Sequence, residues 1–222
     1  MEQLVTANVA SNLYWLGRYL ERTETTLYKI LKAYDETIDV DTSAGAKLYQ
    51  KFDIELSYVD ATEFLHVAIL GDHSANLLDT MTNARESAII SRHRIDTEAF
   101  GEIIELHALF LKISKGDGEI DYKFIDSARS LIREIWGTLS EREHKNNSDI
   151  FLRMGKLVEE ADFRIRFEKD EAVTQTIIEE IDAIVESLND DEESSIQSQS
   201  QSDEEGDLLS EVNSKIDKVI IE

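Results

Sequence analysis

The strongest constraint on the fold is a long amphipathic pattern near the start of the chain. Between residues 9 and 38, apolar side chains recur every three or four positions, which is the spacing of one face of an α-helix. We therefore expect one long helix over 9–38. A second line of residues runs beside the apolar stripe at about 100° per residue. The stripe consists of Val9, Leu13, Leu16, Leu20, Leu27, Leu31, Tyr34 and Ile38, and the second line of Tyr14, Gly17, Glu21, Glu24 and Tyr28.

Gly17 lies in the middle of this predicted helix. A glycine inside a helix costs roughly 1 kcal/mol relative to alanine, so it usually marks a close contact. We favour a contact with a neighbouring helix or a large side chain. The alternative is a small pocket lined by Glu21 and Glu24, in which case these two carboxylates are the candidate catalytic residues.

Residues 149–167 repeat the pattern of residues 11–29 at a constant offset of 138 positions. In each segment a glycine precedes a glutamate by four positions and a second acid by seven. The repeat predicts that the first and last long helices pack together as pseudo-symmetric partners, with the four acids near one seam. These acids either hold a divalent metal, which prefers oxygen ligands, or pair with nearby bases, and we favour pairing. The matched positions are Gly17 with Gly155, Glu21 with Glu159 and Glu24 with Asp162, and the bases are Arg18, Arg22, Lys156, Arg164 and Arg166.

The rest of the chain predicts an all-α fold. Proline, the commonest helix breaker, is absent. We expect an up-and-down bundle of five to seven helices with long first and last helices. Besides the first, the predicted helical segments are 47–70 (one bent helix or two short ones), 75–93, 97–114, 121–139 and 148–188.

The composition changes after residue 188, which we take as the end of a helical domain over 1–188. Residues 189–207 are rich in serine, glutamine and acids, which predicts a disordered acidic linker. Residues 208–222 regain helical spacing and predict a short amphipathic helix. That helix could dock on its own bundle or in a groove of a partner.

The net charge of −24, from 23 basic and 47 acidic side chains, excludes several classes of function. Phosphate backbones and anionic membrane surfaces both need a basic protein surface, so we expect no nucleic acid and no membrane as partner. The chain has no apolar run of about 20 residues and no basic region of the secretory type at its start. We therefore expect a cytoplasmic protein, for which a homo-oligomer is possible.

Recognised catalytic and cofactor motifs are missing from the sequence. It contains no cysteine, no phosphate-binding Gly-rich loop with its lysine, no nucleophile elbow and no His-Glu-x-x-His. Two Glu-x-x-His pairs, Glu63/His66 and Glu141/His144, are near chance in so acidic a chain. We expect no cofactor and assign no metal ligands.

Arg85 and Arg92 stand out in an acidic protein. They lie seven residues apart on one helix face, and with Arg18 and Arg22 they could bind a carboxylate or phosphate through forked donors. The alternative, which we favour, is that they pair with acids inside the bundle. The acids in question are Glu21, Glu24, Glu86 and Glu98.

The run Ala10–Glu24, which reads ASNLYWLGRYLERTE, closely resembles the opening of the bacterial alpha-E domain family. This family is a predicted all-helical domain named for its Glu-Arg motif. Segments 83–98 and 151–159 are similar to its central and second motifs, so the resemblance covers about residues 4–186. The second motif departs from the family pattern, because Lys156 replaces an arginine and Glu159-Glu160 replaces Glu-Arg.

The resemblance implies a role in making or modifying peptide-like amide bonds, because members of the family typically sit beside ATP-grasp amide ligases and transglutaminase-like proteins. We expect a non-catalytic helical partner of such a ligase, and possibly of a transglutaminase-like protein. The alternative is a catalytic domain that acts on a peptide-like substrate with Glu21 and Glu24, perhaps with metal. The candidate binding residues are Tyr14, Gly17, Arg18, Glu21, Arg22, Arg85, Arg92, Glu159 and Asp162.

Overall fold

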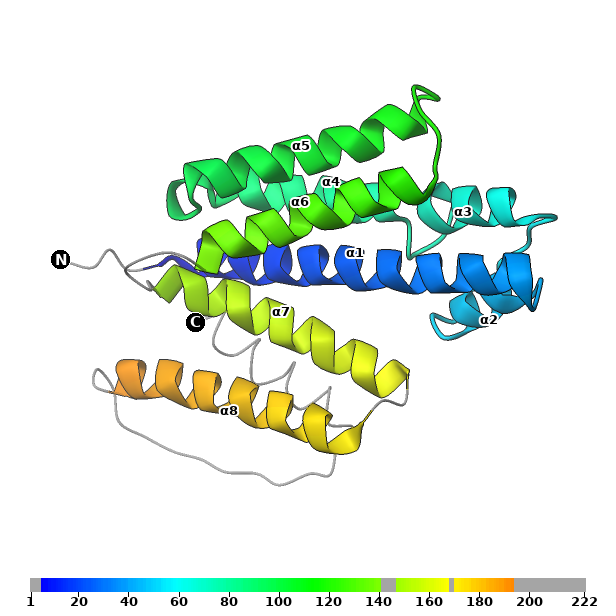
Figure 1. Ribbon diagram of the computed structural model, residues 1–222. Coiled ribbons are helices and arrows are strands. Elements are labelled where there is room, and N and C mark those ends of the chain that lie inside the picture. Colours follow the sequence, from blue (N-terminus) through cyan, green and yellow to red (C-terminus); the bar gives the residue numbers. More distant parts are fainter. Residues whose placement is uncertain (1–4, 141–146, 168–169, 194–222) are drawn as a thin grey trace.

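A computed structural model describes residues 5–140, 147–167 and 170–193, and it confirms the all-α fold (Figure 1). These ranges contain eight α-helices, one short 3-10 helix and no strand. The helices are α1 (Ala7–Asp39), α2 (Ala44–Gln50), α3 (Ala61–Leu70), α4 (Leu77–Ile90), the 3-10 helix η1 (Arg92–Arg94), α5 (Thr97–Ser114), α6 (Tyr122–Ser140), α7 (Asn147–Arg166) and α8 (Glu171–Glu193).

Helix α1 is the centre of the bundle. It contacts α2, α3, α4, α6 and α7, whereas α5 packs on α4 and α6. Helix α7 lies along α1 on the side away from α5, and both helices run in the same direction (Figure 1). Helix α8 packs on α7 and runs back along it. Two segments from opposite ends of the sequence therefore lie side by side.

The core surrounds α1 as far as Leu27, where the apolar stripe of that helix is enclosed. Leu13, Leu16, Leu20 and Leu27 have no exposed surface. Past Leu27 the buried positions become Ile30, Ala33 and Thr37, and the predicted core residue Ile38 is 54% exposed. At about 100° per residue Ile38 lies on the same face as Leu13 and Leu20, so the change is set by the helices that pack against this part of α1 and not by the spacing of the stripe. No helix in the described ranges is both long enough and apolar enough to cross a bilayer.

The segment predicted over 47–70 forms the two short helices α2 and α3. Between them, Asp53 adopts a left-handed conformation with φ of 59°. Asp60 begins α3 through a reciprocal cap: the Glu63 amide donates to Asp60 Oδ1 at 2.8 Å, and the Val59 amide donates to Glu63 Oε2 at 2.6 Å. Val59, an apolar residue just before this helix, is 89% exposed. Glu63 thus serves as a cap residue and not as one half of a Glu-x-x-His metal pair.

The single helix predicted over 148–188 is two helices, α7 and α8. Asp170 begins the second helix, because its Oδ1 accepts a hydrogen bond from the Ala172 amide at 3.0 Å. Helix α8 continues to Glu193. The rest of the predicted linker and the predicted terminal helix (194–222) lie outside the described residues, as do Glu141 and His144.

Candidate functional site

The site is built around the crossing of α1 and α7, where two glycines face each other's helix. A Cβ atom at Gly17 would overlap the carbonyl oxygen of Leu152, and one at Gly155 would overlap the carbonyl oxygen of Tyr14. At the offset of 138 positions, Gly17 corresponds to Gly155 and Tyr14 corresponds to Leu152. The contact of Gly17 with the Leu152 carbonyl is therefore equivalent to the contact of Gly155 with the Tyr14 carbonyl. The predicted pseudo-symmetric pairing of the two helices is therefore confirmed, and so is the interpretation of Gly17 as a helix contact.

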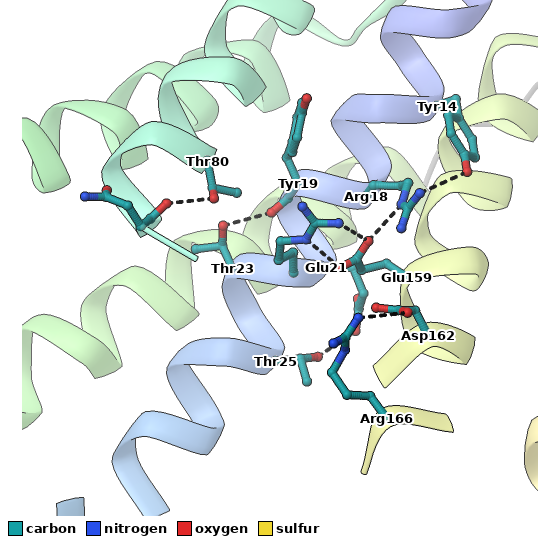
Figure 2. A network of polar contacts seen from close by, with 12 residues as sticks. Tyr14, Arg18, Tyr19, Glu21, Thr23, Thr25, Thr80, Glu159, Asp162 and Arg166 are labelled. Atoms are coloured by element: carbon teal, nitrogen blue, oxygen red, sulfur yellow. Dashed lines mark hydrogen bonds and ion pairs between the residues drawn. The ribbon is translucent and has the colours of Figure 1, made fainter. Parts of the chain in front are cut away.

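On one side of the crossing lies a cluster that we call the Glu159 site, made of Glu159, Arg18 and Arg22. Figure 2 shows Arg18 and Glu159 pointing toward each other from the two helices. Glu159 is 1% exposed and its carboxylate accepts three hydrogen bonds. Arg18 Nε donates to Oε2 at 2.8 Å, and Arg22 donates from Nε to Oε1 at 2.6 Å and from Nη2 to Oε2 at 2.8 Å. A buried carboxylate held by two guanidinium groups is a strong, specific contact between α1 and α7.

Arg18 also has partners on its own helix. Its guanidinium lies over the Trp15 ring at 5.1 Å, and its Nη1 donates to the Tyr14 hydroxyl at 3.5 Å. Burial alone would lower the pKa of Arg18, but Glu159 and Tyr14 raise it above its usual value. Arg18 therefore stays charged, and Tyr14 supports it from a buried position on the same helix face.

The counterpart cluster, which we call the Glu21 site, holds its acid much less firmly. Glu21 is 9% exposed, and Thr25 Oγ1 donates to its Oε1 at 3.1 Å. Lys156 Nζ is 3.8 Å from Oε2, and that oxygen accepts no hydrogen bond from the described residues. Burial raises the pKa of Glu21 to about 7, and Glu24 and Glu160 add to the rise, while Lys156 and Thr25 oppose it.

The difference between the two sites follows from two sequence positions. Lys156 corresponds to Arg18, and Glu160 corresponds to Arg22. The Glu159 site thus has two cations for one acid, whereas the Glu21 site has one cation and a second acid. Glu160 does not contribute to holding Glu21, since it pairs with Arg164 one turn along α7 at 3.1 Å.

The remaining two acids of the repeat also pair with bases, but with different neighbours. Asp162 is 3.4 Å from Arg166 on α7 (Figure 2), and Glu24 is 3.7 Å from Arg133 on α6. The expectation that the four carboxylates share one seam is therefore wrong, because they pair with bases on different helices. No group of three or more histidines, aspartates or glutamates in the described part of the chain is placed to hold a metal ion.

The structure does not bring Arg85 and Arg92 to the crossing. Arg85 pairs with its neighbour Glu86 on the exposed side of α4, and its charge acts on His107 of α5. Arg92 lies over the Phe100 ring of α5 at 4.8 Å. Both arginines thus face α5, whereas Arg18 and Arg22 face α7.

Two cavities flank the crossing, and sequence reasoning identified neither. One of about 240 Å³ opens beside the Glu159 site, and we call it the Glu159-side cavity. The other, of about 420 Å³, lies between α6 and α7 beside Trp136. The two bases of the larger cavity are already engaged, Lys156 with Glu21 and the Trp136 ring, and Arg153 with Glu180. Glu21 lines neither of the two.

Sequence reasoning also missed several residues around these sites. Arg133 reaches Glu24 from α6. Phe52 contributes to the Glu159-side cavity from the turn after α2, and Ser74 and Ala75 contribute from the segment before α4. No local pattern marks these residues, because only the packing of distant segments brings them to the crossing.

Comparison with known protein families identifies the family of the chain. The model of the family Alpha-E, described as a predicted alpha-helical domain with a conserved ER motif, matches residues 5–207. The Glu-Arg pair in the first motif is Glu21-Arg22, whose side chains belong to the Glu21 site and the Glu159 site respectively. No curated protein and no solved structure matches the chain.

Proposed function

The chain belongs to the Alpha-E family, and from this premise we propose that it is a non-catalytic helical partner of an ATP-grasp-type amide ligase. The proposal takes its ligase from the genes that typically accompany members of the family. One structural observation supports the non-catalytic part. The most buried carboxylate of the crossing, Glu159, is bonded three times by Arg18 and Arg22 and so serves to join α1 to α7.

A catalytic site needs charged groups that face a substrate and still have bonds to make. In the Glu159 site the carboxylate is almost fully enclosed, and in the Glu21 site the carboxyl lines neither described cavity. Most of the family motif is thus used to fix the geometry of the bundle. A rigid helical domain of this kind is suited to holding a partner enzyme or its substrate in place.

The strong acidity of the chain favours a partner with a basic surface. A charge of −24 steers association toward positive surfaces and away from polyanions. We expect the ligase, or a transglutaminase-like protein encoded with it, to present such a surface. Binding should then weaken as the salt concentration rises.

The test is to express the protein with the ATP-grasp ligase encoded beside it and to analyse the pair by affinity purification and size-exclusion chromatography. We expect the two to elute together, amide formation to depend on the ligase, and the helical protein alone to give no turnover. Separate elution at low salt, with no change in ligase activity, would contradict the proposal. A pull-down against the transglutaminase-like protein tests the second partner in the same way.

One observation favours the catalytic alternative. Glu21 is a buried carboxyl whose pKa is raised to about 7, which is the range in which a general acid or base works best. If Glu21 and Glu24 catalyse a reaction on a peptide-like substrate, with or without metal, Glu21→Gln should keep the fold and lose that reaction. Unchanged activity of the purified pair with this variant would exclude the alternative.

A further inference from the structure

The Glu159-side cavity contains groups of both charge signs that still have bonds to make. It lies between α1, α7, the turn after α2 and the segment before α4, with a volume of about 240 Å³. Arg22 and Arg166 supply positive charge, and Asp162 and Glu159 supply negative charge. Because Glu159 is 1% exposed and already paired with two arginines, a ligand in this cavity would be recognised by the other groups.

Arg22 provides a fixed donor for an acidic group. Its hydrogen bonds to Glu159 use Nε and Nη2 and leave Nη1 for another acceptor. Its side chain is 32% exposed, so the remaining donors can be reached from the cavity. The pair with Glu159 holds the guanidinium plane in place, and a fixed guanidinium matches the geometry of a carboxylate.

Asp162 provides an acceptor for a basic group on the same wall. Its Oδ1 is 3.4 Å from Arg166 Nη2, which is a long contact, and Arg166 also donates from Nη1 to the Lys51 carbonyl at 3.1 Å. The Asp162 side chain is 20% exposed, and its second oxygen has capacity for an ammonium group. The cavity thus offers one site for an anion and one for a cation.

The remaining wall is aromatic and the space is small. The Phe52 and Phe163 rings meet edge to face with their centroids 5.8 Å apart, and both line the cavity. The volume is below the roughly 300 Å³ at which pockets for larger ligands begin. A ligand should therefore be a small molecule with an apolar group to place against these rings.

We propose that the Glu159-side cavity binds the zwitterion of an α-amino acid with a small apolar side chain. The carboxylate binds Arg22, the ammonium group binds Asp162, and the side chain packs on Phe52 and Phe163. A zwitterion has no net charge, so the acidic field of the protein does not repel it as it would a free anion. The inference rests on the cavity alone and does not depend on partnership with a ligase.

The test uses the full chain labelled with ¹⁵N and three related probes followed by amide chemical shifts. L-valine carries both charges, N-acetyl-L-valine lacks the ammonium group, and L-valinamide lacks the carboxylate. We expect saturable shifts at the cavity with L-valine, and binding weaker by about tenfold or more for each blocked compound, because each loses a charge-assisted bond. The proposal is overturned if L-valine gives no saturable shifts, or if either blocked compound binds as well as L-valine.

A pair of matched variants locates the binding. Asp162→Asn keeps the size of the side chain but removes the partner of the ammonium group, so L-valine should bind about tenfold more weakly. Asp126→Asn makes the same change on the exposed face of α6 and should leave binding unchanged. Equal affinity in the two variants would overturn the assignment. The three probes on the unaltered protein test it independently of how either variant folds.

Discussion

Replacing Glu21 with glutamine removes the titrating group of the Glu21 site while keeping the size of the side chain. We predict that this change reduces the dependence of stability on pH. Glu21 is 9% exposed and faces Lys156 on α7, Glu24 on its own helix and Glu160 on α7. Two acids and one base surround it, so its negative charge is poorly compensated in the folded protein.

The sign and size of the effect follow from the pKa. The usual value is 4.5, which we take for the unfolded chain, and in the folded protein burial raises the pKa of Glu21 to about 7. Between these values the unfolded chain releases its proton while the folded protein keeps it, so the free energy of unfolding falls as pH rises. Above pH 7 Glu21 is ionised in both states, and the free energy of unfolding falls no further. The total loss is roughly 3 kcal/mol, since each unit of pKa difference corresponds to about 1.4 kcal/mol.

The assay is urea unfolding followed by circular dichroism at several pH values between about 4 and 8, where the pKa values place the transition. The free energy of unfolding of Glu21→Gln minus that of the unaltered protein should rise by roughly 3 kcal/mol over this range. Subtraction removes the contributions of the other titrating groups. A difference that does not change with pH would refute the reasoning, because it would mean that Glu21 ionises normally in the folded protein.

Glu160 provides a second test of the same reasoning. Glu160→Arg places a cation at the position that corresponds to Arg22, so it should lower the pKa of Glu21 and flatten the pH dependence. Glu160→Gln is the matched control, since it removes the repulsion without adding a cation and should give a smaller effect. Both variants lose the pair with Arg164 equally. If the arginine variant behaves like the glutamine variant, the correspondence between the two sites has no energetic meaning.

Two further predictions concern packing and capping. Gly17→Ala and Gly155→Ala should each destabilise the protein by roughly 2 kcal/mol or more, because the added Cβ meets a backbone carbonyl. Gly137→Ala, on the open face of α6, should instead stabilise the protein by up to about 1 kcal/mol. Equal shifts of the melting temperature at the three sites would contradict this. Asp60→Ala should cost about 1 kcal/mol in urea unfolding through loss of the cap on α3, and an unchanged midpoint would show that the cap contributes nothing.

Helix positions could be predicted from sequence wherever the signals were local. The starts of α5 and α6 agree with the predicted segments 97–114 and 121–139. Asp96 and Asp121 cap these helices, because their side chains accept from the amides of Glu98 and Phe124 at 2.8 Å. The break before α8 was missed, although Asp170 supplies the same kind of cap, because the apolar stripe continues through it in the sequence. Apolar spacing shows that a segment is helical but does not exclude a reversal of the chain within it.

The contact between α1 and α7 could be predicted because glycines in two repeated segments each required a close neighbour. The partners of the acids could not be predicted in the same way. Glu24 pairs with Arg133 only because α6 packs beside α1, and Arg85 faces α5 only because α4 turns it there. Such pairings depend on the arrangement of whole helices, which no spacing of residues along one segment determines.

The central claim is that the charged residues of the family motif join α1 to α7, and a double-mutant cycle between Arg22 and Glu159 tests it most directly. Arg22→Gln, Glu159→Gln and the double variant are compared with the unaltered protein by urea unfolding. We predict a coupling free energy of roughly 2 kcal/mol, because Arg22 supplies two of the three hydrogen bonds to the buried Glu159 carboxylate and either single change removes this charged pair. A coupling near zero, with the two single effects simply additive, would contradict the account.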